Sequence, residues 1–103
     1  MNSDVKASIQ LAADGRLTGY IAGSAANLGP VRIKSIQAQT SAADGEIKIY
    51  DATSASGDIK IHLKWGEGAN EGLEYNFPGG GVRFETTVYV DLTNCNSFIA
   101  YYT

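Results

Sequence analysis

The sequence has only one cysteine, Cys95, and one histidine, His62, among its 103 residues. A single cysteine cannot close a disulfide within the chain, which excludes a small secreted domain that depends on disulfides. This fits a protein that folds in a cytosol, including one that is later assembled into something that leaves the cell. The same scarcity leaves few groups for catalysis, because a nucleophile works with a base and with a residue that orients that base.

Positive charge is also scarce and scattered. The chain carries 8 Lys and Arg residues against 11 Asp and Glu residues, which gives a net charge of −3, and the basic residues stand singly along the sequence. Without a basic cluster there is no electrostatic footprint for a nucleic acid or an anionic membrane. No segment approaches the roughly 18 apolar residues of a transmembrane helix, and the polar start, Met1–Lys6, does not resemble a signal peptide. We therefore expect no nucleic-acid partner and no membrane partner.

Apolar residues, in contrast, are plentiful enough for a folded core. They make up 44% of the chain, whereas charged residues make up only 18%, below the roughly 25% of an average soluble domain. The length fits a single domain that spans residues 1–103. So thinly charged a surface indicates that part of it contacts something other than water.

The apolar residues alternate with polar ones, which is the pattern of half-buried strands. Asp58–Trp65 is the clearest case, and Val5–Leu11 and Glu46–Asp51 follow the same period. In Val31–Gln39 the phase slips at Lys34 and Ser35, which predicts a β-bulge or a strand that changes sheets. The small residues of Ala22–Pro30 predict a loop.

With turn signals every 8–12 residues, about eight to nine short strands are expected. The sequence therefore predicts an all-β, single-domain β-sandwich, either a jelly roll or a related Greek key. On the predicted phases, four aromatic side chains point into the core: Trp65, Tyr75, Phe77 and Phe84. Two others, Tyr50 and Tyr89, are expected on outward faces.

No motif supplies catalytic chemistry. His62 lies on the polar face of its strand, and Cys95 lies in a turn with no basic residue nearby in sequence to activate it. The glycine-rich segment Pro78–Gly81 lacks the lysine of a phosphate-binding loop. The acidic segment Glu67–Glu74 does not match an EF-hand, although calcium at this loop remains the one metal hypothesis. We therefore predict no catalytic residue, no cofactor and no metal ligand, and hence a protein that is not an enzyme.

The last strand instead suggests a contact with another subunit. Phe98–Tyr102 is apolar on both of its faces, and a strand of that kind is either central in its sheet or covered by a second chain. We expect a homo-oligomer and three contact regions: the strand Val5–Leu11, the loop Ala22–Pro30 and the outer face of the last strand. Candidate interface residues are Val5, Ile9, Leu28, Tyr50, Tyr89, Ile99 and Tyr101.

Three C-terminal segments carry a resemblance to a known family. Phe77–Phe84, Val88–Asn94 and Phe98–Tyr102 resemble the strand and turn patterns of small virion proteins of tailed bacteriophages, notably marine and cyanobacterial phages. The earlier strands fit the front half of the same pattern, so that the resemblance covers residues 17–103. The chain departs from the family where Thr86-Thr87 replaces an Asp-Gly type of turn.

The resemblance implies a jelly-roll-like structural protein that oligomerises on a phage particle after synthesis in the host cytoplasm. The implied role is head decoration, in which a cement protein binds across subunits of the major capsid protein. A position on the tail or a fibre, against other virion proteins, is the alternative within that class. A carbohydrate-binding module is the alternative outside it, because jelly rolls also bind sugars and exposed tyrosines stack on them.

Overall fold

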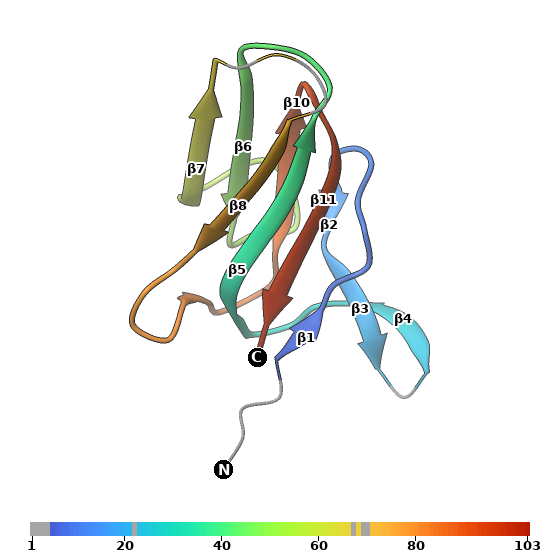
Figure 1. Ribbon diagram of the computed structural model, residues 1–103. Coiled ribbons are helices and arrows are strands. Elements are labelled where there is room, and N and C mark those ends of the chain that lie inside the picture. The colour runs from blue at the N-terminus through green and yellow to red at the C-terminus, as the bar shows by residue number, and fades with distance from the viewer. Residues whose placement is uncertain (1–4, 22, 67, 69–70) are drawn as a thin grey trace.

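Two antiparallel sheets pack face to face in the computed structural model, which describes residues 5–21, 23–66, 68 and 71–103 (Figure 1). The five-stranded sheet has the order β1-β11-β5-β8, and β9 also pairs with β5. The four-stranded sheet has the order β2-β10-β6-β7, and β3 pairs only with β4. The strands are β1 (Lys6–Ala7), β2 (Gly15–Arg16), β3 (Thr18–Ile21), β4 (Ser24–Asn27), β5 (Val31–Thr40), β6 (Gly45–Tyr50), β7 (Ile59–Trp65), β8 (Gly72–Asn76), β9 (Val82–Phe84), β10 (Tyr89–Thr93) and β11 (Cys95–Tyr102).

The pairing of the strands is that of a jelly roll. From the outside of the chain inward, β1 pairs with β11, β2 with β10, β5 with β8 and β6 with β7, always antiparallel. Such nested pairs form one long ribbon, and wrapping that ribbon around a core gives two facing sheets. The predicted all-β sandwich is thus confirmed. Its strand number exceeds the expectation because hairpin β3–β4 and the short β9 are added between the strands of the ribbon.

The core lies between the inner faces of the two sheets. Phe98 and Phe84 contribute its largest fully buried side chains, with Ile33, Ile47 and Ile49 around them. Trp65 and Phe84 are buried as predicted, and Phe77 packs partly buried against the core. A contiguous apolar cluster of this kind is the main source of stability in a domain of this size.

The predicted slip in β5 is a β-bulge. Tyr101 is opposite Ser35, but the next residue, Tyr102, is opposite Ile33, so that Lys34 is the extra residue. Burial follows the slip, because Ile33 before it and Ile36 after it are both buried. The bulge also divides the edge of β5, which pairs with β9 on one side of Lys34 and with β8 on the other.

Three details of the sequence prediction are wrong. Only Lys6–Ala7 of the segment Val5–Leu11 forms a strand, and Val5 and Ala7 are exposed while Ser8 is buried. Ser8 fits there because its hydroxyl accepts the Ala100 N–H at 2.9 Å. The expected loop Ala22–Pro30 contains β4. Tyr75 shares the face of Ile36, its partner in β5, but it is 36% exposed because β8 is an edge strand.

The two ends of the sandwich differ in how they are closed. At the turn end, defined by the turns after β5, β7 and β10, the buried Thr40 hydroxyl donates to the Gly68 carbonyl at 2.7 Å and accepts the Glu71 N–H at 2.9 Å. Asn94 is in the left-handed region, with φ 55°, and its side-chain amide donates to the Ala43 carbonyl at 2.9 Å. Side chains therefore tie these neighbouring connections together.

Gly45 is required at the same end. It lies opposite Trp65 in the pairing of β6 with β7, and a Cβ atom at this position would overlap the indole ring. The ring thus covers the glycine backbone, while its N–H donates to the Ala42 carbonyl at 3.3 Å. Packing an aromatic residue across from a glycine restores the contacts that the glycine lacks.

Candidate interaction surface

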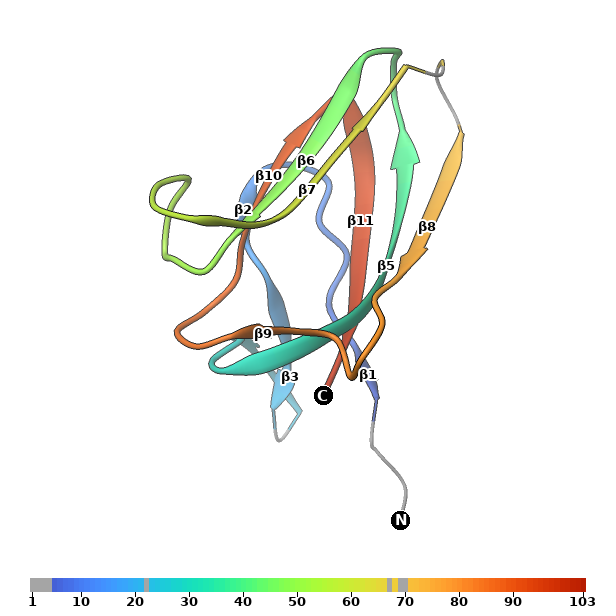
Figure 2. The same ribbon diagram turned by 90° about the vertical axis from the view of Figure 1, so that its left-hand side faces the viewer.

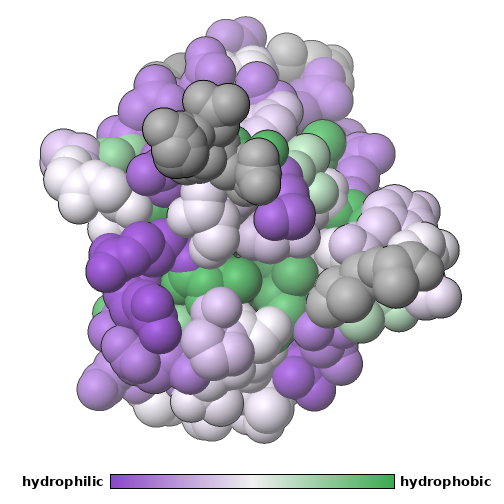
Figure 3. All heavy atoms as spheres, turned by 90° about the horizontal axis from the view of Figure 1, so that it is seen from below, coloured by the Kyte–Doolittle hydropathy of each residue, from purple (hydrophilic) through white to green (hydrophobic). Residues whose placement is uncertain are grey.

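The opposite end of the sandwich is hollowed and apolar. A cavity of about 430 Å³ opens there between hairpin β3–β4, β1 and the end of β11, and Figure 3 shows apolar residues in a hollow on this face. We call it the end hollow. It is lined by Lys6, Tyr20, Leu28, Gly29, Pro30, Val31, Tyr102 and Thr103. Among the described residues of this lining, Lys6 is the one charged residue, so that the surface suits an apolar partner segment.

Hairpin β3–β4 forms one wall of the end hollow and is held by the residues at its base. Leu28 donates its N–H to the Leu17 carbonyl at 3.0 Å and accepts the Thr87 hydroxyl at 2.7 Å. Gly19 makes room, because a Cβ atom there would overlap the Tyr102 hydroxyl and touch Leu28. The hairpin is therefore anchored to the core, while Tyr20 stands 66% exposed.

The other wall joins the two ends of the described chain. β1 pairs with β11, with Lys6 opposite Tyr102. Beyond β11, Thr103 exchanges both backbone hydrogen bonds with Arg32, each at 3.0 Å. The end hollow thus contains residues from two of the three contact regions expected from the sequence, Val5–Leu11 and Ala22–Pro30, whereas Ile99 and Tyr101 on the outer face of the last strand do not line it.

The predicted interface residues fall into three groups. Val5, 49% exposed, precedes Lys6 at the end hollow, and Ile9 is half-buried and donates its N–H to the Thr18 carbonyl at 2.8 Å. Leu28 and Tyr50 were expected at the surface, and this expectation is wrong, because they are only 3% and 7% exposed. Leu28 belongs to the core cluster, and the register shift after Ile49 ends the regular alternation at Tyr50. The remaining three, Tyr89, Ile99 and Tyr101, are half-buried.

Ile99 and Tyr101 lie on the outer face of the five-stranded sheet, which is mostly neutral. A shallow groove of about 400 Å³ runs beside Ile99, and its polar lining comes from Gln37, Gln39, Glu74 and Ser97. The Tyr101 hydroxyl donates to the Gln37 side-chain carbonyl at 2.9 Å. This face therefore offers hydrogen-bonding groups with little charge.

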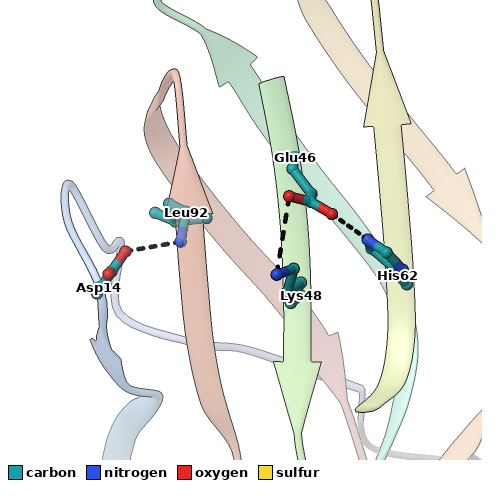
Figure 4. A network of polar contacts seen from close by, with 5 residues as sticks. All are labelled: Asp14, Glu46, Lys48, His62 and Leu92. Carbon is teal, nitrogen blue, oxygen red and sulfur yellow. Dashed lines mark hydrogen bonds and ion pairs between the residues drawn. The ribbon is translucent and has the colours of Figure 1, made fainter. Parts of the chain in front are cut away.

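The outer face of the four-stranded sheet is charged instead (Figure 4). Glu46 pairs with His62 across the strands and lies 3.8 Å from the Lys48 ammonium. The hydrogen bond with His62 holds the pKa of the Glu46 carboxyl below its ordinary value. Partial burial and, next, the neighbouring Asp14 carboxylate raise the pKa of Asp91. Surface pairs of this kind keep a face solvated and contribute little to stability.

The structure does not bring the two candidate catalytic groups together. His62 is exposed on the outer face of β7, whereas Cys95 belongs to the core cluster and lies on β11 of the other sheet. Burial raises the pKa of the Cys95 thiol, which disfavours the reactive thiolate.

The acidic segment Glu67–Glu74 shows no metal site in its described part. Glu67 lies outside the described residues, and Glu71 and Glu74 are exposed. Among the residues that the structure does describe, no group of three or more His, Cys, Asp or Glu side chains could hold a metal ion. Over the same residues, no helix is long and apolar enough to cross a membrane.

Sequence reasoning missed Tyr20, the most exposed large apolar side chain at the end hollow. It lies opposite Ala25 in hairpin β3–β4. The signal was Gly23, whose φ of +84° suits a tight turn between two short strands. The hairpin was not predicted because the small residues of β4 give no alternation of apolar and polar side chains.

Comparison with known proteins finds no matching family model, no similar curated protein and no similar solved structure. The class defined here is thus a jelly-roll domain with one apolar hollow end and one charged outer face.

Proposed function

We propose that the protein is a non-enzymatic structural component of a bacteriophage virion and that it attaches through the end hollow. The observation that carries this proposal is the apolar cavity at one end, which is lined by the 66% exposed Tyr20 and by Lys6, the chain neighbour of the exposed Val5. An apolar surface with an aromatic residue beside a pocket is the usual anatomy of a protein interface. Because the C-terminal segments resemble phage virion proteins, the partner in this proposal is another protein of the virion.

Within the virion, head decoration is the favoured position, with the major capsid protein as partner. A decoration protein is added from outside to a finished lattice, so that it needs a rigid fold and one exposed docking end. The jelly roll supplies the first, and the end hollow supplies the second. A tail or fibre position uses the same surface against another virion protein.

A binding experiment with heads that lack the protein tests the proposal. Wild-type protein should sediment with such heads and raise the temperature at which they release DNA. Tyr20→Asp should weaken the binding by about tenfold or more, because a charge would be buried at the contact. Ile59→Asp is the matched control, since Ile59 is 41% exposed on β7 but does not line the end hollow, and it should bind normally. Sedimentation only with tails would move the protein there, and no binding to any virion part would overturn the proposal.

A carbohydrate-binding module is the second candidate, favoured by the groove beside Ile99. Amide and hydroxyl side chains line it together with the Glu74 carboxylate, and such groups hydrogen-bond the hydroxyls of a glycan. Tyr50 and Tyr89, the tyrosines expected on outward faces, do not form an exposed pair for stacking on a sugar, because Tyr50 is buried. Titration with host polysaccharide should then show binding that Tyr101→Ala reduces, and the absence of binding would end this candidate.

A further inference from the structure

Five described strands, β1, β2, β7, β8 and β9, have a free edge in the two sheets, and four of them are blunted. β9 has only three residues and carries Arg83. β1 and β2 have only two residues each. β7 is longer, but it carries Lys60 and Lys64. Short strands and lysines are the means by which natural sheets prevent pairing at an edge. β8 has five residues, Gly72–Asn76, and neither a lysine nor a proline. β7 and β8 lie on the same side of the sandwich (Figures 1 and 2). The presence of lysines on β7 and their absence from β8 therefore do not come from a difference in surroundings.

The free backbone groups of β8 can be identified from its pairing with β5. Phe77 donates its N–H to the Lys34 carbonyl, and Thr40 donates its N–H to the Glu71 carbonyl, both at 2.9 Å. Antiparallel residue pairs alternate between hydrogen-bonded and non-hydrogen-bonded ones. Hence Leu73 and Tyr75 turn their backbone groups toward β5. The intervening residues, Gly72, Glu74 and Asn76, turn theirs away from the sheet.

We propose that β8 pairs with β8 of a second copy of this chain, antiparallel and centred on Tyr75. In this register the outward N–H and C=O groups of Glu74 lie opposite those of Asn76 in the partner copy, and the two residues exchange a pair of hydrogen bonds. The two-fold axis repeats the same pair between Asn76 and the Glu74 of the partner copy. The two Tyr75 rings form a close non-hydrogen-bonded pair, the arrangement in which cross-strand aromatic residues pack best. Leu73 faces Phe77 of the partner copy on the same side of the joined sheet.

Other registers are less favourable. Centring the pair on Glu74 would place two carboxylates opposite each other, and like charges in that position are destabilising. Centring it on Leu73 would set Tyr75 against Glu71 and would lose the aromatic pair. The Tyr75 register alone combines apolar partners on one face with a carboxylate and an amide on the other. It also accounts for the 36% exposure of Tyr75 on a side otherwise turned to the core. The pairing does not depend on the proposed place of the protein in a virion.

Sedimentation equilibrium of the purified chain over a range of concentrations tests the pairing. The wild type should dimerise with a dissociation constant of micromolar order. Tyr75→Lys should abolish the dimer, because a lysine on β8 would oppose edge pairing as Lys60 and Lys64 do on β7. Asn76→Glu should raise the dissociation constant about tenfold, because two Glu-to-Glu contacts form across the axis. The double variant Glu74→Lys with Asn76→Glu should restore the wild-type value, since each contact becomes Lys to Glu.

Asn96→Glu is the matched control, because Asn96 is an exposed asparagine on β11, and it should leave dimerisation unchanged. Circular dichroism checks that each variant is folded, and Asn76 is exposed, so that its substitution disturbs no core contact. In the dimer the amides of Glu74 and Asn76 should become protected from hydrogen exchange as concentration rises. A monomeric wild type, or a dimer that neither Tyr75→Lys nor Asn76→Glu weakens, would overturn the proposal. If the double variant Glu74→Lys with Asn76→Glu did not restore the dimer that Asn76→Glu weakens, the proposed register would be overturned.

Discussion

The two ends of this sandwich are built from the same strands and yet are closed differently. At the turn end, Thr40, Asn94 and Trp65 each bond to the backbone of a neighbouring turn. At the end hollow, the connection between the sheets is a hairpin that leaves Tyr20 outside and a cavity beneath it. The partly buried hydrogen bonds of Thr40 and Trp65, whose partners would be left unsatisfied on mutation, make the first end sensitive to small changes. An open apolar end tolerates substitution and keeps surface free for a partner.

The largest effect expected from this comparison comes from Gly45→Ala at the turn end. The new methyl group would overlap the Trp65 ring and also approach the Thr93 carbonyl. We expect the free energy of unfolding to fall by about 3 kcal/mol, measured by urea denaturation followed by circular dichroism. Gly72→Ala is the control, because nothing lies within 4 Å of the added carbon. Equal stability of the two variants would show that the indole ring is not fixed.

A smaller loss is expected when the Thr40 hydroxyl is removed. Thr40→Val keeps the shape of the side chain but leaves the Glu71 N–H and the Gly68 carbonyl without their partner. This should cost about 2 kcal/mol in the same denaturation experiment. Thr93→Val, at an exposed position of β10, should change stability by less than about 0.5 kcal/mol. If Thr40→Val were as mild, water would be replacing the hydroxyl and the turn end would be less closed than described.

Asp51 accepts backbone hydrogen bonds from the connection between β9 and β10, whose Thr87 holds Leu28 of the end hollow, and makes this connection sensitive to pH. Burial raises the pKa of this carboxyl, but the backbone N–H groups of Glu85, Thr86 and Thr87 outweigh burial and lower it overall. A lowered pKa in the folded state means that the stabilisation is present above the unfolded pKa and is lost as pH falls through the folded one. We expect Asp51→Asn to cost about 1 kcal/mol at neutral pH and the difference from wild type to shrink below about pH 4.

The exposed Asp58, in the same connection between β6 and β7, provides the comparison for this prediction. Asp58→Asn should match the wild type at neutral pH. A difference between Asp51→Asn and wild type that stayed constant down to acid pH would mean that the charge of Asp51 is not what holds the turn.

The smallest effect on stability is expected at the end hollow itself. Tyr20 is 66% exposed, so that Tyr20→Ala should change the free energy of unfolding by less than about 0.5 kcal/mol. Denaturation by urea measures this, alongside the binding assay with virion heads. A loss of 2 kcal/mol or more would mean that Tyr20 holds the hairpin in place, and the contrast between the two ends would disappear.

The strands that follow a clear period of two were predictable from the sequence. Glu46–Asp51 and Asp58–Trp65 correspond to β6 and β7 within a residue or two, and the phase slip at Lys34 is the observed bulge. Their inner faces are apolar because they are buried against the opposite sheet. The alternation of apolar and polar residues that results can be recognised in the sequence.

The rest depends on contacts between distant segments. β4 forms only because β3 is paired with it, and no side-chain period marks it. The same is true of the candidate site, since Leu28 and Tyr102 meet across the space that Gly19 leaves open. Exposure at an edge, as at Tyr75, follows from the order of strands in the sheet. Local sequence does not contain that order.

The position of Trp65 offers an optical consequence. It is the only tryptophan, it is 8% exposed, and it lies at the turn end as the last residue of β7, whereas it does not line the end hollow. Its emission should therefore shift to longer wavelength when the sandwich opens, yet stay constant when a partner occupies the opposite end. One fluorophore, present without labelling, thus distinguishes loss of structure from attachment.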